Sequence, residues 1–491
     1  MMIRIGTRVF ALFAATLTCG ACGGRPVPLP DSPVVRSRDR VATMTLTAMR
    51  GADGRDAFVF DGRDVAPTIR IAPGDTLKIH YLNALPPAPY RAIPTAQMNM
   101  TNLHFHGLSI SPDRPADDVL EMIAMPGEAL DYRVAIPPTH LPGLHWYHTH
   151  PHGESHRQVL DGMSAALIVE GIEDYAPQVR GLRERVLVIR AADLEHDPRA
   201  SAARARVEVD RSPCGESRDE VDRVFTINGV LRPEITMEPG TRQFWRIVNA
   251  APDRYVDIDI PHQRLEVVAY DGFPIAYHDP SHPSRFVDHV LIPPAGRVEA
   301  IVTAPERESR SVFRTRCVDT GPDGDPNPGM VLADIASAKT VAPPPAPAAI
   351  VSRPSPTPVL VDVKPIERNP PAFTAVFSED KSGFYINGLK FAPDAAPMVR
   401  AKVGTYQHWR IVNDSREIHP MHIHQVHFLA FRENDHAVAD PRWLDTVNVA
   451  VGGSVDIVMD FTDPVIRGMS VFHCHLLNHE DKGMMAKILF E

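Results

Sequence analysis

The amino-acid sequence predicts an all-β protein that is built from several related domains. Short runs rich in β-branched and aromatic residues alternate with turns that contain proline or glycine, and helical periodicity is weak. Segments of similar sequence recur along the chain, as expected when one structural unit is repeated. The 491 residues are also too many for a single hydrophobic core. The clearest strand-like runs are residues 77–82, 186–189, 286–292 and 455–461.

Residues 1–24 have the composition of a secretory signal. Arg4 and Arg8 precede an apolar run at residues 9–17, which is too short to cross a bilayer as a stable helix. Cys22 is followed by two glycines and resembles the lipid-attachment cysteine of bacterial lipoproteins; the alternative is ordinary cleavage nearby. We expect an exported protein of the periplasm or cell envelope that has no transmembrane span and is either free or lipid-anchored at Cys22.

The charge pattern indicates which partners the protein can bind, and the cysteine content indicates its redox compartment. A formal net charge of −10, with both signs interspersed, argues against nucleic-acid binding, which requires a basic face. Of five cysteines, two lie in the signal region and Cys474 lies among histidines. This leaves Cys214 and Cys317 as the spare pair in an exported chain, and we expect a disulfide between them; two separately buried thiols are the alternative.

Two sequence units recur along the chain. The first runs from Ile-Asn-Gly through a glycine turn to Trp-Arg-Ile-Val-Asn; it occupies residues 225–249 and 384–413, with a fainter copy at 60–83. The second is a glycine-containing turn that leads into an apolar strand, and its three copies are residues 126–136, 294–302 and 452–461. Both units indicate three related β-domains.

The repeats predict domains at residues 40–175, 180–340 and 359–491. Residues 341–358 are dense in proline and alanine. Because proline has a fixed φ and no N–H, this composition disfavours both helix and central strand. We expect residues 341–358 to be the linker before the last domain.

The C-terminal stretch at residues 473–485 contains the sequence His-Cys-His. Side chains alternate faces along a strand, so His473 and His475 would point one way and Cys474 the other, and one strand could serve two metal sites. Cys474 can combine with His479 and a weak axial Met484, the ligand types of an electron-transferring blue copper. The alternative is a histidine-rich strand with a buried thiol.

Three further histidine clusters lie only in the first and third predicted domains. Each contains a His-x-His pair, which on a strand presents both imidazoles on one face. One such pair is weak evidence because it usually lies on a solvated strand face, but four pairs in two related domains indicate metal binding. The histidines of these clusters are His104, His106, His145, His148, His150, His419, His422 and His424.

These motifs resemble those of the multicopper oxidases, in particular the three-domain, laccase-like bacterial type. The matching segments are His-x-His-Gly at 104–107, Trp-Tyr-His-x-His at 146–150, His-Pro-x-His-x-His at 419–424 and His-Cys-His-x3-His-x3-Gly-Met at 473–484. The resemblance implies three cupredoxin-like Greek-key β-barrel or sandwich domains. The middle repeat has no histidine cluster at residues 251–260 and is expected to be a spacer without copper.

The resemblance also implies four copper ions and assigns their ligands. The mononuclear type 1 (blue) copper would be held by His419, Cys474, His479 and Met484. A trinuclear cluster between the first and third domains would contain a type 2 copper and a coupled type 3 pair. Its ligands would be His104 and His422 for the type 2 copper, and His106, His148, His150, His424, His473 and His475 for the pair.

Acidic residues near these motifs are candidates for proton transfer. Glu480 follows His479 and, by resemblance to bacterial members of the family, would relay protons to bound oxygen species; a surface salt bridge is the alternative. Asp117 matches an acidic residue that the family keeps beside the cluster, although Asp118 leaves the register open. Asp445 would either orient a ligand imidazole or begin a turn. We expect the surplus histidines to be structural or on the surface: His145, His152, His156 and His427.

The predicted function is that of an oxidase. Four one-electron coppers can supply the four electrons that dioxygen needs to become water. The partners would be dioxygen and a small reducing donor of the phenol or aromatic-amine type. We expect the protein to be a monomer, because three domains in one chain are enough to form the cluster between domains. The alternatives are a cuprous-ion oxidase in copper tolerance and a non-catalytic copper-storage or envelope protein. No methionine-rich insertion is present near the blue-copper motif, and no ligand position is substituted, which weakens both alternatives.

Overall fold

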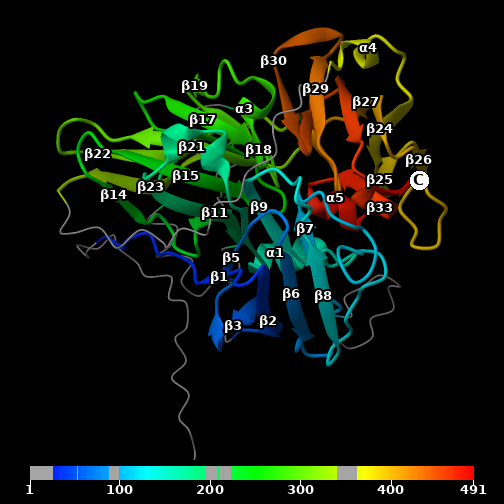
Figure 1. Cartoon of the computed structure of the whole chain (residues 1–491), viewed down its shortest axis with the longest axis horizontal. Helices are drawn as coiled ribbons and strands as arrows, with labels where there is room; N and C mark the ends of the chain where they lie inside the picture. The colour runs from blue at the N-terminus through cyan, green and yellow to red at the C-terminus, as the bar shows by residue number, and fades with distance from the viewer. Residues whose placement is uncertain are drawn as a thin grey trace, which may run out of the picture.

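The chain folds into three β-rich lobes in the computed structural model, which describes residues 26–51, 53–87, 99–193, 207–210, 214, 223–339 and 362–491. Figure 1 shows the first lobe in blue to cyan, the second in green and the third in yellow to red. The predicted signal at 1–24 and the predicted linker at 341–358 lie outside the described residues. Within the described ranges, no helix has the length and apolar character needed to cross a membrane.

The first lobe contains two sheets, with strand orders β1-β5-β10-β9-β7 and β4-β3-β2-β6-β8. In β2 and β6, buried and exposed residues alternate, so one face packs on the core and the other faces water. The strands are β1 (Val34–Arg36), β2 (Val41–Arg50), β3 (Asp56–Phe60), β4 (Arg63–Asp64), β5 (Thr68–Ile71), β6 (Thr76–Asn83), β7 (His104–His106), β8 (Ala129–Ala135), β9 (Gly143–His148) and β10 (Ser164–Val169).

Strands β9 and β10 are buried on both faces. One face packs into the core of the first lobe, with Tyr147 and Leu167 among its residues. The other face places Trp146 and Ile168 against Val248 of the second lobe. This apolar contact joins the two lobes directly beside the histidines at the end of β9.

The second lobe has sheet orders β13-β11-β15-β21-β17-β18 and β12-β23-β22-β16-β20, with β19 paired to β17 and β14 paired to β23. Its core lies between the two sheets. The strands are β11 (Arg183–Asp193), β12 (Val209–Asp210), β13 (Arg223–Ile227), β14 (Glu234–Met237), β15 (Arg242–Asn249), β16 (Val256–Asp259), β17 (Leu265–Tyr270), β18 (Phe273–Pro274), β19 (Arg285–Val287), β20 (Val290–Ile292), β21 (Arg297–Thr303), β22 (Ser309–Arg316) and β23 (Gly329–Ser337).

The third lobe has sheet orders β25-β24-β27-β32-β29-β30 and β26-β34-β33-β28-β31. Its core includes Cys474 and Met484 together with Tyr255 and Val318 from the second lobe. The strands are β24 (Phe373–Asp380), β25 (Gly383–Ile386), β26 (Val399–Ala401), β27 (Thr405–Asp414), β28 (His419–Ile423), β29 (Phe428–Glu433), β30 (His436–Leu444), β31 (Thr446–Val449), β32 (Ser454–Phe461), β33 (Gly468–Cys474) and β34 (Met485–Phe490).

The helices of the described residues are short and lie in connections. They are α1 (Ser155–Asp161), α3 (Ile275–His278), α4 (Lys364–Glu367), α5 (Leu477–Asp481), and the 3-10 turns η1 (Ile172–Asp174), η2 (Pro177–Val179) and η3 (Pro464–Ile466). Helices α1 and α5 pack together, which brings the first and third lobes into contact at the C-terminal His-Cys-His motif.

The prediction of one strand at residues 286–292 was wrong. The chain turns at Asp288 and His289, so that β19 pairs with β17 in one sheet and β20 pairs with β16 in the other. The two halves of the apolar run therefore serve different sheets.

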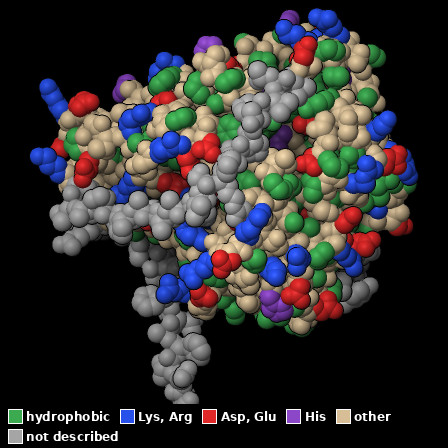
Figure 2. All heavy atoms as spheres, viewed as in Figure 1, with side chains coloured by type: hydrophobic (Ala, Val, Ile, Leu, Met, Phe, Trp, Pro, Cys, Tyr) green, Lys and Arg blue, Asp and Glu red, His purple; other side chains and the backbone are tan. Residues whose placement is uncertain are grey.

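The disulfide prediction is confirmed, because Cys214 and Cys317 are bonded, with their Cα atoms 5.8 Å apart. On the molecular face in Figure 2, acidic and basic side chains are interspersed, as the charge pattern of the sequence indicates.

Candidate copper centre

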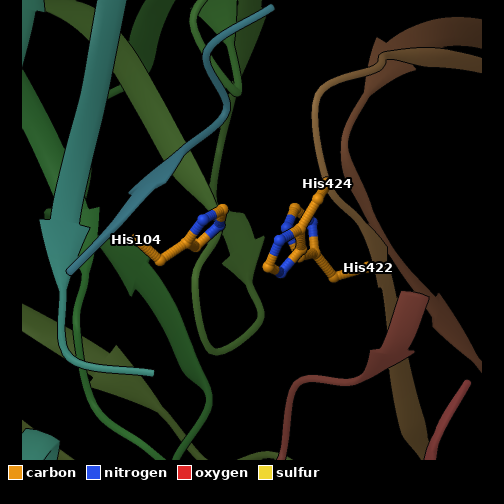
Figure 3. Close-up of side chains that lie close together, drawn as sticks. All are labelled: His104, His422 and His424. Atoms are coloured by element: carbon orange, nitrogen blue, oxygen red, sulfur yellow. The ribbon is translucent and has the colours of Figure 1, made fainter. Parts of the chain in front are cut away.

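Strand pairing brings the histidine motifs together in facing rows. In the first lobe, His104 on β7 lies opposite His148 on β9. In the third lobe, His422 on β28 lies opposite His473 on β33. The two rows face each other between the lobes, and Figure 3 shows the His104 side chain directed at those of His422 and His424. The ring centroids of His104 and His424 are 3.7 Å apart and nearly parallel.

Eight buried histidines form this interlobe cluster. The Nε2 atom of His473 lies 3.3 Å from the Nε2 atoms of both His150 and His424. Nitrogen lone pairs this close repel one another unless a proton or a cation lies between them. The eight members are His104, His106, His148, His150, His422, His424, His473 and His475.

Hydrogen bonds fix the outer ring nitrogen of several cluster histidines and leave the inner one without a partner. Nδ1 of His148 donates to the Thr149 carbonyl at 2.9 Å, and Nδ1 of His422 donates to the Asp445 carbonyl at 2.7 Å. The Nε2 atoms of both residues, and of His104 and His106, are buried without a hydrogen-bond partner. Buried unpartnered acceptors are unfavourable, and metal ions would satisfy them. The cluster therefore fits a group of copper ions.

The protonation state also suits metal binding. Burial lowers the pKa of His148 to about 3, helped by the neighbouring His150. Burial likewise lowers the pKa values of His150 and His473 to about 4. The imidazoles are therefore neutral at physiological pH, which is the form that ligates metals.

A second buried group lies on the other face of β33. The Sγ atom of Cys474, which is a free thiol, is 3.4 Å from Nδ1 of His419 and 3.9 Å from Nδ1 of His479. The other ring nitrogens have partners: Nε2 of His419 bonds the Ser415 hydroxyl at 2.8 Å, and Nε2 of His479 lies 3.1 Å from Glu417 Oε1. Both Nδ1 atoms are thus directed toward the thiol. Two imidazoles and one thiolate are the donor set of a blue copper.

Met484 is fully buried beside this group. The Cys474 amide donates to the Met484 carbonyl at 3.1 Å, and the Met484 amide donates to the His479 carbonyl at 2.9 Å. The short α5 segment thus folds the chain back, and its main-chain hydrogen bonds hold the buried residues Cys474, His479 and Met484 near one another.

Asp117, and not Asp118, lies beside the interlobe cluster. Its carboxylate accepts from Nδ1 of His104 at 3.0 Å, from the Phe105 amide at 3.0 Å and from the Gln425 side chain at 2.7 Å. Asp118 instead pairs with Arg114 near the surface. Burial raises the pKa of Asp117, against the lowering effect of the Phe105 and Gln425 hydrogen bonds.

Asp445 acts in a way that the sequence does not reveal. Its carbonyl, not its carboxylate, accepts from His422, while the carboxylate pairs with Arg297 at 2.6 Å. Arg297 is a fully buried residue of β21 in the second lobe, and nothing in its local sequence marks it as part of the site. The carboxylate is also 3.7 Å from Nδ1 of His106.

Glu480 is fully buried in α5 and is not a surface carboxylate. Its Oε1 atom lies 3.8 Å from Nδ1 of His152, and these two residues group with Asp481 beside the cluster. Burial raises the pKa of Glu480, while His150 acts to lower it. A protonated carboxyl group beside the histidines can donate a proton.

A cavity of about 690 Å³ lies between the three lobes. Gln425 and His427 line it, together with His145 and an aromatic wall that includes Phe273 and Trp443. Gln425 bonds Asp117, and His427 Nε2 lies 3.9 Å from the Asp445 carboxylate, so the cavity meets the cluster through both acidic residues.

The surplus histidines lie outside the two ligand groups. His145 forms part of the cavity wall, and His427 bonds the Asp271 carbonyl at 3.0 Å. His156 pairs with Asp253, and His152 is partly exposed beside Glu480.

Comparison with known proteins identifies the class. Three models described as multicopper oxidase match residues 41–174, 184–333 and 353–491. The chain belongs to the multicopper oxidase family: it is an oxidoreductase of the cupredoxin fold that binds copper.

Relatives cover nearly the whole chain. "Multicopper oxidase mco" of Staphylococcus haemolyticus is 22% identical over 87% of this chain and 83% of its own length. A laccase of Bacillus subtilis is 22% identical over 94% of this chain and 96% of its own. Among solved structures, a multicopper oxidase of Campylobacter jejuni described as a metallo-oxidase superposes with a TM-score of 0.68 at 22% identity, covering 94% of this chain and 98% of that one.

Proposed function

We propose that this protein is an exported copper oxidase that takes single electrons from phenolic or aromatic-amine donors and reduces dioxygen to water. The observation that carries the proposal is the position of Cys474. Its side chain faces one buried donor set, while the adjacent His473 and His475 face the other. One strand therefore joins a site suited to electron transfer to a site suited to a metal cluster.

The ligand assignment follows the two buried groups. His419, Cys474, His479 and Met484 would hold the mononuclear type 1 copper. His104 and His422 would hold the type 2 copper, and His106, His148, His150, His424, His473 and His475 the type 3 pair. When bound, four copper ions would store the four electrons that dioxygen reduction requires.

The residues between the two groups provide a short covalent path. Cys474 is bonded through the main chain to His473 and His475. In addition, Nδ1 of His473 donates to the Cys474 carbonyl at 3.0 Å, which fixes the ring against the strand. Burial of all three residues excludes water from this path.

Protons and water need routes of their own. Glu480 lies 3.8 Å from His152 and Asp117 bonds His104, and these two residues are the proposed proton relays. The interlobe cavity would admit dioxygen and release water past Gln425 and His427.

Export is proposed from residues 1–24 and agrees with the Cys214–Cys317 disulfide, a bond of oxidising compartments. A single chain supplies every ligand, so a monomer suffices.

Cuprous-ion oxidation is the second candidate. The Glu417 carboxyl group lies 3.1 Å from Nε2 of His479, where a donor would deliver its electron. Burial raises the pKa of this group to about 9, so a cationic donor would bind its oxygen atoms with release of the proton. One structural relative is itself described as a metallo-oxidase.

The test is oxygen uptake by copper-loaded protein with phenols, aromatic amines, bilirubin-like pigments and cuprous ion. We expect turnover with phenols or aromatic amines, and preference for cuprous ion would select the second candidate. Cys474→Ser should abolish both the blue absorption and oxygen uptake, whereas His80→Gln, at an exposed histidine of the first lobe, should change neither. Full copper occupancy without uptake for any donor would refute the oxidase function.

A further inference from the structure

The sequence of the second lobe has no His-x-His pair, yet two of its loops together contact the two chain segments that hold the proposed blue-copper histidines. The 250–255 loop joins β15 to β16, and the 317–328 loop joins β22 to β23. Residues from both loops, Tyr255 and Val318, are buried in the same core cluster as Cys474 and Met484.

The 250–255 loop contacts both segments. The Leu477 amide, in the segment between Cys474 and His479, donates to the Pro252 carbonyl at 2.9 Å. Tyr255, which is 1% exposed, directs its hydroxyl to the carbonyl of Ile418 at 3.5 Å. Ile418 is the residue directly before His419.

The 317–328 loop holds the His419 segment from another side. The Ile418 amide donates to the Thr320 carbonyl at 3.0 Å. The Asp323 amide donates to the Arg416 carbonyl at 3.3 Å, and the side chains of Asp323 and Arg416 form an ion pair at 2.8 Å. Main-chain groups on both sides of Glu417 are therefore tied to the second lobe.

The two loops behave as one unit because Asn327 joins them. Its side-chain oxygen accepts from the Tyr255 amide, and its side-chain nitrogen donates to the Tyr255 carbonyl, both at 3.0 Å. The disulfide at Cys317 fixes the start of the 317–328 loop. A displacement of either loop would thus reach both histidine segments.

We propose that the second lobe is a clamp that positions His419 and His479, and so sets the electronic properties of the type 1 site. This inference rests on the proposed function, because it requires that these residues bind copper. Hydrogen bonds behind metal ligands fix the orientation of the ligands and tune the metal, and the potential of a blue copper depends on its surroundings. Tyr255, Pro252 and Thr320 are therefore positioning residues, and the lobe is more than the spacer that the sequence predicts.

Gly321 allows the clamp to be loosened at one point. Its φ is +96°, and an added Cβ would overlap the Arg416 carbonyl oxygen and lie 3.0 Å from the Glu417 Cα. Gly321→Ala should therefore push the loop away from the His419 segment. Gly229→Ala is the matched control: it lies in the same lobe at φ +80°, and its Cβ would meet nothing within 4 Å. Both variants carry the same left-handed strain.

Leu477 gives an independent test on the other segment. It is the first residue of α5, where proline is tolerated, and Leu476 has the extended conformation that a following proline requires. Leu477→Pro removes the amide that bonds the Pro252 carbonyl. Leu477→Ala keeps that amide while also shortening the buried side chain, and is the control.

The readouts are the blue absorption band, the copper hyperfine splitting and the reduction potential of the copper-loaded full chain, alongside donor oxidation. We expect Gly321→Ala and Leu477→Pro to shift the band and the potential relative to their controls, and to slow donor oxidation on the order of tenfold. Tyr255→Phe removes only the hydroxyl that contacts the Ile418 carbonyl, so this variant should fold fully and shift the reduction potential. It provides the test if the other variants unfold.

Two negative results are distinguishable. If the wild-type protein, fully loaded with copper, shows no blue band, the proposed function fails and the clamp fails with it. If the wild type is blue but the folded variants match their controls in band position and potential, the clamp is refuted and the oxidase function stands.

Discussion

At the scale of single residues, the orientation of several cluster imidazoles is set by what the outer ring nitrogen bonds. Thr149 and Asp445 supply main-chain carbonyls to His148 and His422, and Asp117 supplies a carboxylate to His104. The inner nitrogens are then held toward one another before any metal arrives. Such preorganisation favours binding, but it stores unpaired buried nitrogens in the copper-free protein.

Acid should destabilise the copper-free protein through these histidines. The pKa of His148 is lowered by burial from its ordinary 6.5 to about 3. The unfolded chain takes up the proton first, so the stabilising contribution is complete above pH 6.5 and is lost as the pH falls toward 3. In urea unfolding of copper-free protein, His148→Gln should lose less stability than the wild type between pH 7 and pH 5. Equal losses of stability in the variant and the wild type would contradict the lowered pKa of His148 as a cause of the acid effect.

Glu480 should govern the oxygen half of the reaction only. Burial raises the pKa of its carboxyl group beside His150 and His152, as a proton donor requires. Glu480→Gln should lower steady-state oxygen uptake by about a hundredfold or more. Anaerobic bleaching of the blue band by the donor, followed by stopped flow, should keep its wild-type rate. A slowed bleaching step would show instead that the substitution disturbs the blue site.

At the scale of elements, buried ion pairs join strands of the first and second lobes. Glu184 on β11 bonds Arg70 on β5 at 2.7 Å and also pairs with Arg246 on β15. Arg246 in turn pairs with Glu299 on β21, whose carboxylate accepts from the Leu144 amide of β9 at 3.0 Å. This network lies in the same lobe contact that supports the histidines of β9.

The network predicts a stability change in the acid range. Burial alone would raise the pKa of Glu184, but Arg246 and Arg70 outweigh it and lower the pKa from 4.5 to about 2. The contribution is complete above pH 4.5 and is lost as the pH falls to about 2. Glu184→Gln should lower the free energy of unfolding by about 3–5 kcal/mol at pH 7, because two buried arginines lose a partner. Between pH 4.5 and 2, the free energy of unfolding should also fall less in Glu184→Gln than in the wild type.

Urea unfolding monitored by tryptophan fluorescence measures this effect. Glu121→Gln is the control, because the Glu121 side chain is 74% exposed. This substitution should change the free energy of unfolding by less than about 0.5 kcal/mol. A Glu184→Gln protein as stable as the control would show that the buried pairs contribute little.

At the scale of the whole molecule, the cluster ligands come from the two ends of the chain. The first lobe supplies its histidines before residue 151 and the third after residue 418, and the second lobe braces both through Arg297 and the loops at Tyr255 and Thr320. Copper bound between the lobes would therefore link folding of one to the other.

Copper loading should accordingly stabilise the folded chain as a unit. At a free copper concentration a hundredfold above Kd, the free energy of unfolding should rise by about 2.7 kcal/mol per independent site. Differential scanning calorimetry should show a higher midpoint for loaded than for chelator-treated protein. In His106→Asn, which lacks one proposed cluster ligand, the rise should be smaller, and an unchanged rise would contradict the interlobe assignment.

Much of the fold and of the candidate site could be read from the sequence because the information is local. Strand alternation separates Cys474 from His473 and His475, motif spacing identifies the histidines, and cysteine counting pairs Cys214 with Cys317. These inferences need only a few neighbouring residues or a count over the chain.

Other features depend on contacts that no local pattern encodes. Arg297 reaches Asp445 across 148 positions, and Tyr255 reaches Ile418 across 163. The choice of Asp117 over Asp118 depends on how the loop between β7 and β8 folds back on His104, and the division of residues 286–292 between two sheets depends on which strands pair. Local sequence fixes which donor atoms are available and which face of a strand they occupy. Their partners are selected by packing between the lobes, because burial leaves each polar group only the few neighbours that the assembled sheets bring within hydrogen-bonding distance.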